Sequence, residues 1–542
     1  MRMHCRRSLV VVALSLVVLS GSLGRPLLAQ PAVPAPPRIL LDTSYTPPSG
    51  RTIAVRAGGD LQSALNTAQP GDVITLEPGA VFRGNFSLPK KTGTAWIVVR
   101  SGAPDEKLPS PGTRVTPAFS PVMTKIVSPN SNPALSTEPG AHHYRLIGIE
   151  FAVAPSVKRI YSIVAFGGTQ SSEAETPHDL ILDRCYVHGE PALTTFRGVL
   201  LNSASSAIID SHVSEIHAAG NDSQSVLGYN GPGPFKIVNN FLEGAAENIM
   251  FGGADPKLSG LVPSDIEIRQ NHLFKPLSWR PGNPGFGGVQ WTIKNLLELK
   301  NAQRVLIEGN LLENNSGPAL LLTPRNQGGR APWSVVQDVV FRSNIVKNAA
   351  SGFIMLASDD LRPSQTTKRI AVVNNLWLGV TRRFFGMTGG GPAGPLEDVL
   401  IDHNTAIPVG YATYFSETTV LRFRLTNNLF GFGAFGVTFP KADEGLAKRL
   451  PGAVIARNAL ASLADTGDGR GASRNGPHYI NQMMYTSFPN AVAAGLNPDG
   501  TLTPTSRNRR AGTDGKDVGV DFAELQRAMG WAAGEMTRED RR

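Results

Sequence analysis

Residues 423–431, FRLTNNLFG, hold the pattern that decides the fold. Alternating apolar residues lead to a polar residue and an asparagine, and two or three more apolar residues follow. The pattern recurs in FKIVNNFLEG (235–244), IEIRQNHLF (266–274), VLIEGNLLE (305–313), VVFRSNIVK (339–347), IAVVNNLWL (370–378) and VLIDHNTAI (399–407). An apolar residue at every second position is typical of a β-strand and not of a helix.

The repeated asparagine gives the period of the repeat. It stands at positions 240, 271, 310, 344, 375, 404 and 428. The steps therefore run from 24 to 39 residues, which indicates one supersecondary unit stacked many times, with insertions looping out. Asparagine suits a tight turn because it tolerates left-handed backbone geometry and hydrogen-bonds locally. We expect stacked coils with an internal asparagine ladder, in which Cys185 and Ser211 take the asparagine position of two earlier coils.

The composition of the 542-residue chain suits such an array. It is 41% hydrophobic and 18% charged, and its 57 Gly and 41 Pro are expected of many short strands joined by turns. Residues 1–29 read as a secretory signal peptide, because arginines precede an apolar run at 9–19 that is too short for a lasting membrane span. Without these residues the net charge falls by four, from +9 to +5, and Cys185 is the one remaining cysteine. We therefore expect a secreted or periplasmic monomer with no intrachain disulfide.

The remaining chain divides into three further parts. Residues 30–50 are Pro-rich and predict an extended linker or edge segment, and the repeats fill residues 51–462. At the start of the repeats, Asp60 is a suitable cap for a short amphipathic helix that covers the first coil. Residues 463–542 form a tail and cap, in which 515–533 predict a short amphipathic helix that closes the other end.

Taken together, these features resemble the right-handed parallel β-helix proteins of the pectate-lyase-like superfamily. The resemblance covers residues 52–460 and is carried by the opening block LQSALNTAQPGDVITLEPGAVFRG (61–84), the Asn-turn repeats and the secretory context. It implies an all-β solenoid with three strands per coil, in which the strand before the asparagine is the second. The superfamily includes polysaccharide lyases, polygalacturonase-type hydrolases, uronan epimerases, phage tailspikes and adhesins, so the fold leaves the activity open.

The resemblance also predicts where a substrate binds. In such folds the groove lies along the stacked first strands, expected here at 248–253, 291–299, 319–326, 353–358, 383–389 and 411–416. The adjoining insertions are 254–264, 279–290, 327–337 and 359–368. Loops on a rigid scaffold carry function, so we expect a cleft beside these insertions.

A polysaccharide lyase is the first functional hypothesis. Removing the proton beside a uronate carboxylate needs a base and a positive charge that holds the carboxylate. Lys294 and Arg325 are predicted on neighbouring first strands, where coils about 4.8 Å apart would let both face one sugar ring. Lys294 would be the base, and Arg325 would bind the carboxylate and stabilise the enolate. Glu247 and Asp255, with Asn248 beside them, would hold calcium through oxygen ligands.

This arrangement is similar to the chondroitinase B and alginate lyase group, in which a lysine base and an arginine act with calcium-bound carboxylates. That group carries a Glu-x-Glu pair, a Lys-Ser and an Arg-His-Gly. Residues 247–253 have one carboxylate and no Lys-Ser, and 291–299 have no Arg-His-Gly. The alternative for Lys294 and Arg325 is that they are solvated coil residues in ordinary ion pairs.

Two other hypotheses stand beside the lyase. Asp359 and Asp360 would serve a glycoside hydrolase as acid and base, although adjacent aspartates in a Pro-containing loop are commonly turn formers. A non-catalytic carbohydrate-binding or surface protein is the third. Trp279, Trp291 and Trp333 fall in or beside the long insertions and would stack on sugar faces, joined by Arg362. An acidic polysaccharide is the expected partner; nucleic acid is not, because an exported chain with no dense basic patch does not suit it.

Overall fold

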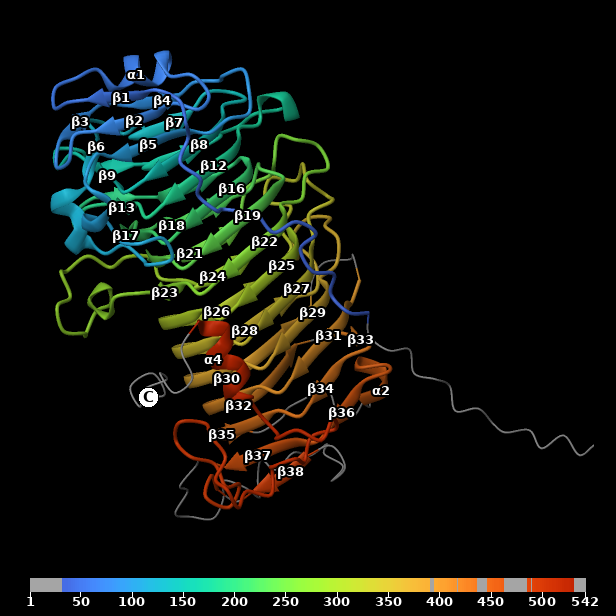
Figure 1. Ribbon diagram of the computed structural model, residues 1–542. Coiled ribbons are helices and arrows are strands. Elements are labelled where there is room, and N and C mark those ends of the chain that lie inside the picture. Colours follow the sequence, from blue (N-terminus) through green and yellow to red (C-terminus); the bar gives the residue numbers. More distant parts are fainter. Residues whose placement is uncertain are drawn as a thin grey trace, which may run out of the picture.

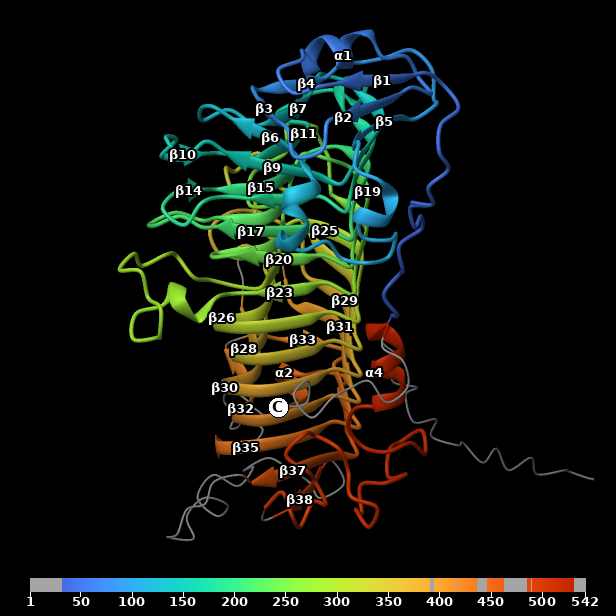
Figure 2. The same cartoon turned by 60° about the vertical axis from the view of Figure 1, so that its left-hand side comes forward.

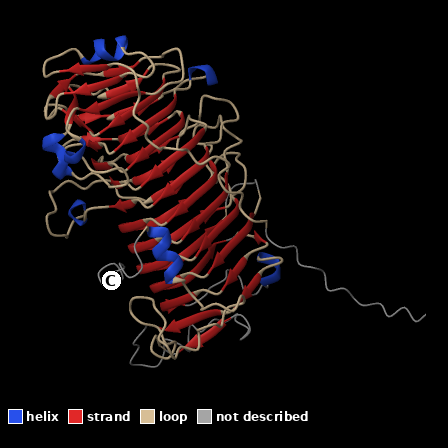
Figure 3. Cartoon of the chain, in the orientation of Figure 1, coloured by secondary structure: helices blue, strands red, loops and turns tan. Residues whose placement is uncertain are grey.

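The structure is a computed structural model that describes residues 32–389, 394–416, 418–435, 446–462, 485–488 and 490–530. The signal peptide, residues 463–484 and residues 531–542 of the predicted tail lie outside the described residues. Figures 1 and 3 show one long stack of strands, and the sequence colours of Figure 1 run along it from blue to orange. Every pairing between the named strands is parallel, so the predicted right-handed parallel β-helix is confirmed.

Two large sheets and one small sheet contain the strands. The strands of the first sheet (sheet A) are β1 (Thr52–Val55), β2 (Val73–Leu76), β5 (Ile97–Ser101), β8 (His142–Ile147), β12 (His178–Asp183), β16 (Ala204–Ile209), β19 (Gly233–Val238), β22 (Ser264–Arg269), β25 (Ala302–Glu308), β27 (Val336–Arg342), β29 (Lys368–Val373), β31 (Leu396–Asp402), β33 (Val420–Leu421), β34 (Arg424–Thr426) and β36 (Val454–Ala456). From β12 onward these strands, β33 excepted, precede the turns that carry the asparagine or its replacement by Cys185 and Ser211, as predicted. A two-stranded sheet pairs β10 (Arg159–Ile160) with β14 (Thr194–Thr195).

The second large sheet (sheet B) takes both the strand after each turn and the first strand of the next coil. Its strands are β3 (Val81–Arg83), β4 (Phe86–Leu88), β6 (Thr124–Ser128), β7 (Leu135–Thr137), β9 (Ile149–Val153), β11 (Val164–Phe166), β13 (Tyr186–His188), β15 (Arg197–Leu201), β17 (His212–Ile216), β18 (Gln224–Gly228), β20 (Phe241–Gly244), β21 (Glu247–Phe251), β23 (His272–Phe274), β24 (Leu297–Leu299), β26 (Leu311–Leu322), β28 (Ile345–Leu356), β30 (Leu376–Thr388), β32 (Thr405–Ser416), β35 (Leu429–Phe435), β37 (Asn458–Ser462) and β38 (Tyr485–Phe488). From β26 onward the two kinds of strand join into one long strand with a register shift at the bend.

The asparagine ladder is present as predicted. The Oδ1 atom of each ladder asparagine accepts a hydrogen bond from the backbone N–H of the ladder residue one coil earlier. The donors run from Ser211 through Asn240, Asn271, Asn310, Asn344, Asn375 and Asn404 to Asn428, which donates to Asn458. Ser211 accepts from the Cys185 N–H through Oγ, which confirms that both residues take the asparagine position.

The left-handed backbone lies one residue before the position that the sequence suggested. The residue preceding the ladder residue has φ between 50° and 64° in each coil, namely Arg184, Asp210, Asn239, Gln270, Gly309, Ser343, Asn374, His403, Asn427 and Arg457. The ladder asparagine is therefore selected for its buried side chain, which donates and accepts along the stack, and not for its tolerance of left-handed geometry.

The predicted N-terminal cap is confirmed. Helix α1 (Leu61–Thr67) begins after Asp60, whose side chain accepts from the Ser63 N–H, and it buries Leu61 and Leu65 over the first coil. Four single turns of 3-10 helix lie in the loops, at Asp105–Lys107, Pro117–Val122, Glu173–Glu175 and Leu277–Trp279. A further short helix, α2 (Leu446–Arg449), precedes β36. No helix among the described residues is long and apolar enough to cross a membrane.

The C-terminal helix lies elsewhere than predicted. Helix α4 (Phe522–Met529) does not close the end of the stack, because its buried Leu525 and Met529 pack with Ile345, Leu376 and Leu378 of the middle coils. Figures 1 and 2 show it in red against the side of the stack near β28 and β30. The apolar residues that follow the ladder turns of these coils form the surface that its amphipathic face covers.

Candidate functional site

Glu247 is the centre of the most connected polar group on the predicted first strands. It is the first residue of β21 and has no exposed surface, although it is a carboxylate. Its Oε2 accepts from Gln224 Nε2 at 2.7 Å, and its Oε1 lies 3.1 Å from Lys294 Nζ. Lys294 Nζ also contacts Asp222 Oδ2 at 2.8 Å. We call Asp222, Gln224, Glu247 and Lys294 the Lys294 cluster.

The cluster has one buried and one accessible side. Lys294 and Asp222 retain 33% and 43% of their side-chain exposure, whereas Glu247 lies beneath them at 0%. Gln224 pairs in register with Glu247 across neighbouring coils, so stacking brings these side chains together. A ligand would therefore meet Lys294 and Asp222 first.

The ionisation of the cluster follows from this burial. Burial, together with the nearby charge of Glu298, raises the pKa of Glu247 to about 7, although Lys294 opposes the shift. Burial by itself would lower the pKa of Lys294, but Glu247 and Asp222 outweigh it and hold that pKa above its ordinary value. Lys294 therefore stays protonated, which suits a group that binds an anion better than the general base that the sequence suggested.

Several buried polar atoms beside the cluster have no hydrogen-bond partner among the described residues. They include Gln224 Oε1, Ser225 Oγ, Asn248 Oδ1 and Asn315 Oδ1. Asn315 is tied directly to the cluster, since its Nδ2 donates to the Lys294 carbonyl at 2.7 Å. Buried polar groups are normally satisfied, so ordered water would have to complete the hydrogen bonding of these atoms.

Two of the three predicted tryptophans lie together beside an unpredicted histidine. The His217 ring stacks on Trp291 with centroids 3.9 Å apart, and Trp279 meets the same ring edge to face at 5.2 Å. His217 is fully buried and its Nε2 lies 2.9 Å from Glu215. Trp279 is itself 6% exposed, so this stack anchors the 279–290 insertion to the coil, and Trp291 is its more accessible member.

Trp333 and Asn248 also have structural partners. Trp333 Nε1 donates to the Leu261 carbonyl at 3.0 Å, which joins the insertions 254–264 and 327–337. Asn248 is fully buried, and its Nδ2 donates to the carbonyls of Leu242 and Phe274. Asn248 is therefore not placed to meet a sugar directly, whereas Trp333 keeps part of its surface exposed.

Arg325 belongs to a second group, at the other end of the strands. Its guanidinium contacts both Asp359 and Asp360. Asp359 is buried and accepts from the N–H groups of Asn326 and Leu361. Burial by itself would raise the pKa of Asp359, but these hydrogen bonds and the charge of Arg325 outweigh it and lower the pKa. Arg362 donates to the Gln327 carbonyl. Asp359 therefore holds a turn as an ionised carboxylate, and Asp360, Arg325 and Arg362 form the exposed rim around it.

The structure does not bring Lys294 and Arg325 to one sugar ring. Strand β24 begins at Leu297, so Lys294 precedes its strand, whereas Arg325 follows the end of β26 at Leu322. The pairing of Leu297 with Leu320 places Lys294 at the level of Gly317. At about 3.3 Å per residue the strand from Gly317 to Leu322 spans roughly 17 Å. The prediction that Lys294 and Arg325 face one sugar ring was wrong because it assigned residues 291–296 to strand β24, which begins only at Leu297.

The predicted calcium pair does not fit either. Glu247 begins β21, and Asp255 lies beyond its other end at Phe251. Asp255 accepts from the N–H groups of Gly328 and Arg330, so it holds the 327–330 turn. One ion cannot be bound by both carboxylates.

Sequence reasoning missed three polar residues near the cluster. Asp222 lies in a polar loop with no motif. Lys275 is fully buried, and its Nζ donates to the carbonyls of Gly244, Ala245 and Ala246, just before Glu247. Burial lowers its pKa to about 7. Glu298 accepts from Asn295, three residues earlier, and from Thr323 on the next coil. Lys275 follows an Asn turn, and in the sequence it is marked only as a charge at the end of an apolar stretch, which does not indicate a buried lysine.

Comparison with known proteins identifies no family for this chain. No protein-family model matches the chain, and no curated protein matches it. Among solved structures, the chain is similar to a PL6 family alginate lyase, at 13% identity and a TM-score of 0.48 over 87% of this chain and 56% of that one. It is similar to a mannuronic acid specific polysaccharide family 6 lyase from human gut microbiota, at 12% identity and a TM-score of 0.47 over 82% of this chain and 92% of that one. It is also similar to a GH87 alpha-1,3-glucanase from Streptomyces thermodiastaticus, at 11% identity and a TM-score of 0.42 over 82% and 69%. The chain thus spans little more than half of the first of these proteins.

Proposed function

We propose that the protein is an exported carbohydrate-active enzyme that cleaves an acidic, uronate-containing polysaccharide by β-elimination at the Lys294 cluster. The observation that carries the proposal is a partly exposed lysine that two carboxylates hold in its charged form, 2.8 Å from Asp222 and 3.1 Å from Glu247. Trp291, at the edge of the same region, supplies an apolar ring for a sugar face.

The roles differ from those that the sequence suggested. Lys294 binds the uronate carboxylate and offsets the negative charge that develops on it. Asp222, the exposed carboxylate beside it, takes the proton from the carbon next to the uronate carboxylate. The C–O bond at the following carbon then breaks, a carbon–carbon double bond forms, and the leaving oxygen takes up a proton. Glu247 keeps Lys294 charged and in place from below.

Hydrolysis is the second candidate, and one geometric observation favours it. The carboxylate oxygens of Asp222 and Glu247 both lie within 3.1 Å of Lys294 Nζ, so they cannot be farther apart than twice that distance. This bound includes the carboxylate separation of about 5–5.5 Å found in retaining glycosidases.

The absorbance of unsaturated uronate products near 235 nm tests the proposal. The mature protein is mixed with a panel of uronate polysaccharides, and reducing ends are measured in parallel. We expect a rise in absorbance that is lost in Lys294→Ala and Asp222→Asn and kept in Lys257→Ala, a matched exposed lysine in the nearby insertion. A rise that survives in Lys294→Ala would refute the role of this lysine. New reducing ends without absorbance indicate hydrolysis, and neither signal indicates a binding protein.

A further inference from the structure

Three histidines and an aspartate meet at the edge of sheet A, far along the sequence from the Lys294 cluster. His142 and His143 begin β8, and His178 and Asp179 begin β12. Strand pairing places His178 opposite His142, so Asp179 follows opposite His143. Because stacked coils lie about 4.8 Å apart, the pair His142 and His143 lies next to the pair His178 and Asp179.

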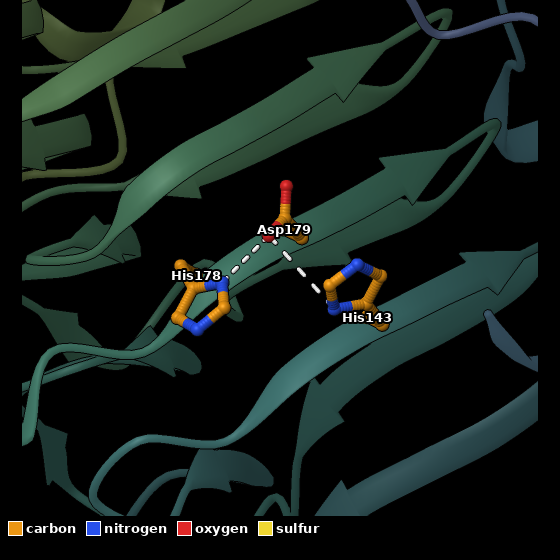
Figure 4. A group of neighbouring side chains, drawn as sticks. All are labelled: His143, His178 and Asp179. Carbon is orange, nitrogen blue, oxygen red and sulfur yellow. Dashed lines mark hydrogen bonds and ion pairs between the residues drawn. The ribbon is translucent and has the colours of Figure 1, made fainter. Parts of the chain in front are cut away.

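The backbone explains why these side chains converge. His143 and Asp179 have φ values of 60° and 52°, in the left-handed region. Successive residues of a regular strand point to opposite faces, and a left-handed residue interrupts that alternation. Figure 4 shows the side chains of His143, His178 and Asp179 turned toward one another from two adjacent strands.

The distances suit a shared cation. Asp179 Oδ2 lies 2.6 Å from His178 Nδ1 and 3.8 Å from His143 Nδ1, and one ligand atom from each residue lies within 4.8 Å of the other two. A tetrahedral zinc ion with bonds of 2.0–2.2 Å holds its ligand atoms roughly 3.4 Å apart. The printed separations fall on both sides of this value, so small side-chain rotations would complete the geometry.

His142 supplies a fourth candidate ligand. Its Nδ1 lies 2.8 Å from His143 Nδ1, and its ring stacks on His178 with centroids 4.8 Å apart. Two ring nitrogens at this distance need either one proton between them or a cation nearby. Trp96 packs against His143 from the preceding coil at 5.4 Å and shields one side of the group.

The exposure of the group also suits metal binding. Side-chain exposures of 16% for His143, 40% for His178 and 33% for Asp179 leave the group open to an entering ion. Within the part of the chain that the structure describes, no other three such side chains come this close.

We propose that His143, His178 and Asp179 bind a divalent zinc ion that links the coils of β8 and β12, with His142 or water in the fourth position. Imidazole nitrogens with one carboxylate favour zinc, cobalt or nickel over calcium. The site is separate from the cation site that the sequence suggested at Glu247 and Asp255, and it does not depend on the proposed carbohydrate activity. Its effect is to join two successive coils through side chains that strand pairing alone leaves unconnected.

Calorimetric titration of the metal-free, untagged mature protein with zinc chloride tests the site, and the visible spectrum of added cobalt reports its geometry. We expect one equivalent bound with a dissociation constant in the micromolar range or below, and the absorption bands of tetrahedral cobalt. His178→Ala and Asp179→Asn should each weaken binding by at least tenfold. His272→Ala is the matched control, because His272 also pairs with a carboxylate, Glu313, at 2.7 Å.

The two site variants keep the test decisive. Asp179→Asn is nearly isosteric and preserves the fold even where removal of a stacked imidazole does not. No zinc binding to the wild-type protein, or equal affinity in the wild-type protein, His178→Ala and Asp179→Asn, would overturn the proposal. Weaker binding in His272→Ala with unchanged binding in the site variants would overturn it as well, by moving the ion elsewhere.

Discussion

The asparagine ladder supplies a quantitative prediction about stability. Asn344 lies in the middle of the ladder and is fully buried. Its Nδ2 donates to Asn375 Oδ1 and to the carbonyls of Ile307 and Arg342, each at 3.0 Å. Its Oδ1 accepts from the backbone N–H and from Nδ2 of Asn310, each at 2.9 Å. Asn344→Ala removes all of these bonds at once.

The loss of stability in Asn344→Ala comes from the buried groups that lose their hydrogen-bond partners. The Asn310 N–H becomes a buried donor without its acceptor, which costs about 1–3 kcal/mol. The loss of the donated bonds adds about 1 kcal/mol or more. We therefore expect Asn344→Ala to lower the free energy of unfolding by about 2–4 kcal/mol.

A serine at the same position is the matched control, because the chain already contains one. Ser211 occupies a ladder position, accepts from the Cys185 N–H and donates to the Ile209 carbonyl. Asn344→Ser keeps an acceptor near the Asn310 N–H, so we expect it to cost about half as much as the alanine, roughly 1–2 kcal/mol.

Urea unfolding followed by circular dichroism gives the free energies. Hydrogen exchange of the Asn310 amide gives the local effect, which is needed because a repeat array can open in parts. Equal destabilisation by alanine and serine would show that the side-chain acceptor is not what stabilises the turn. So would a loss below about 1 kcal/mol in the alanine variant, since an unsatisfied buried amide costs at least that much.

Two predictions concern ionisable groups outside the site. Burial raises the pKa of Glu243 to about 7 from 4.5, so between these values the native state keeps a proton that the unfolded state has lost, and stability falls as pH rises. The loss of stability should reach about 3 kcal/mol by pH 8, as measured by urea midpoints. It should be absent in Glu243→Gln, and a pH profile in that variant equal to that of the wild-type protein would contradict the prediction. Burial also raises the pKa of the Cys185 thiol to about 12, so a thiol reagent should label it only after unfolding, and rapid labelling of the native protein would be the contrary result.

The fold was predictable because its signal repeats. A single strand–turn pattern is weak, but the same pattern over many coils fixes both the strands of sheet A and the ladder, including Cys185 and Ser211. The candidate site has no such repetition. Lys294 was assigned to a strand that begins only at Leu297, and this error of a few residues moved it along the groove. Asp222 and His217 lie where the chain leaves the repeat, so no periodic signal identifies them.

The N-terminal segment has no repeat of its own, but the repeated coils of the β-helix determine where it binds. Residues 32–45 run along the outer edge of sheet A as a strap, visible in blue in Figures 1 and 2. The N–H groups of Ala32, Ala35 and Arg38 donate to Asp398, Asp338 and Asp265. These aspartates lie two coils apart, so every third residue of the strap meets every second coil.

The spacing has a simple physical origin. Three residues of polyproline II chain rise about 9.3 Å, and two coils of the stack measure about 9.6 Å. The Pro-rich composition favours that extended form, so the strap and the stack match in length over successive anchors. Each aspartate is also held by an arginine of the next coil, as Arg369 holds Asp338 at 2.6 Å. Of the two alternatives predicted for this segment, a linker or an edge segment, its contacts with the coils fit the edge segment.

A proline scan separates the anchoring amides from the Pro-rich composition. Ala35→Pro removes the N–H that donates to Asp338, and we expect it to loosen the strap by about 1 kcal/mol, which raises the rate of tryptic cleavage after Arg38 about fivefold. Val33→Pro is the control, because Val33 is 83% exposed and lies between two anchors; a proline there favours the extended form and leaves cleavage unchanged or slower. Equal cleavage rates in the two variants would mean that composition, and not the match between strap and coils, keeps the segment in place.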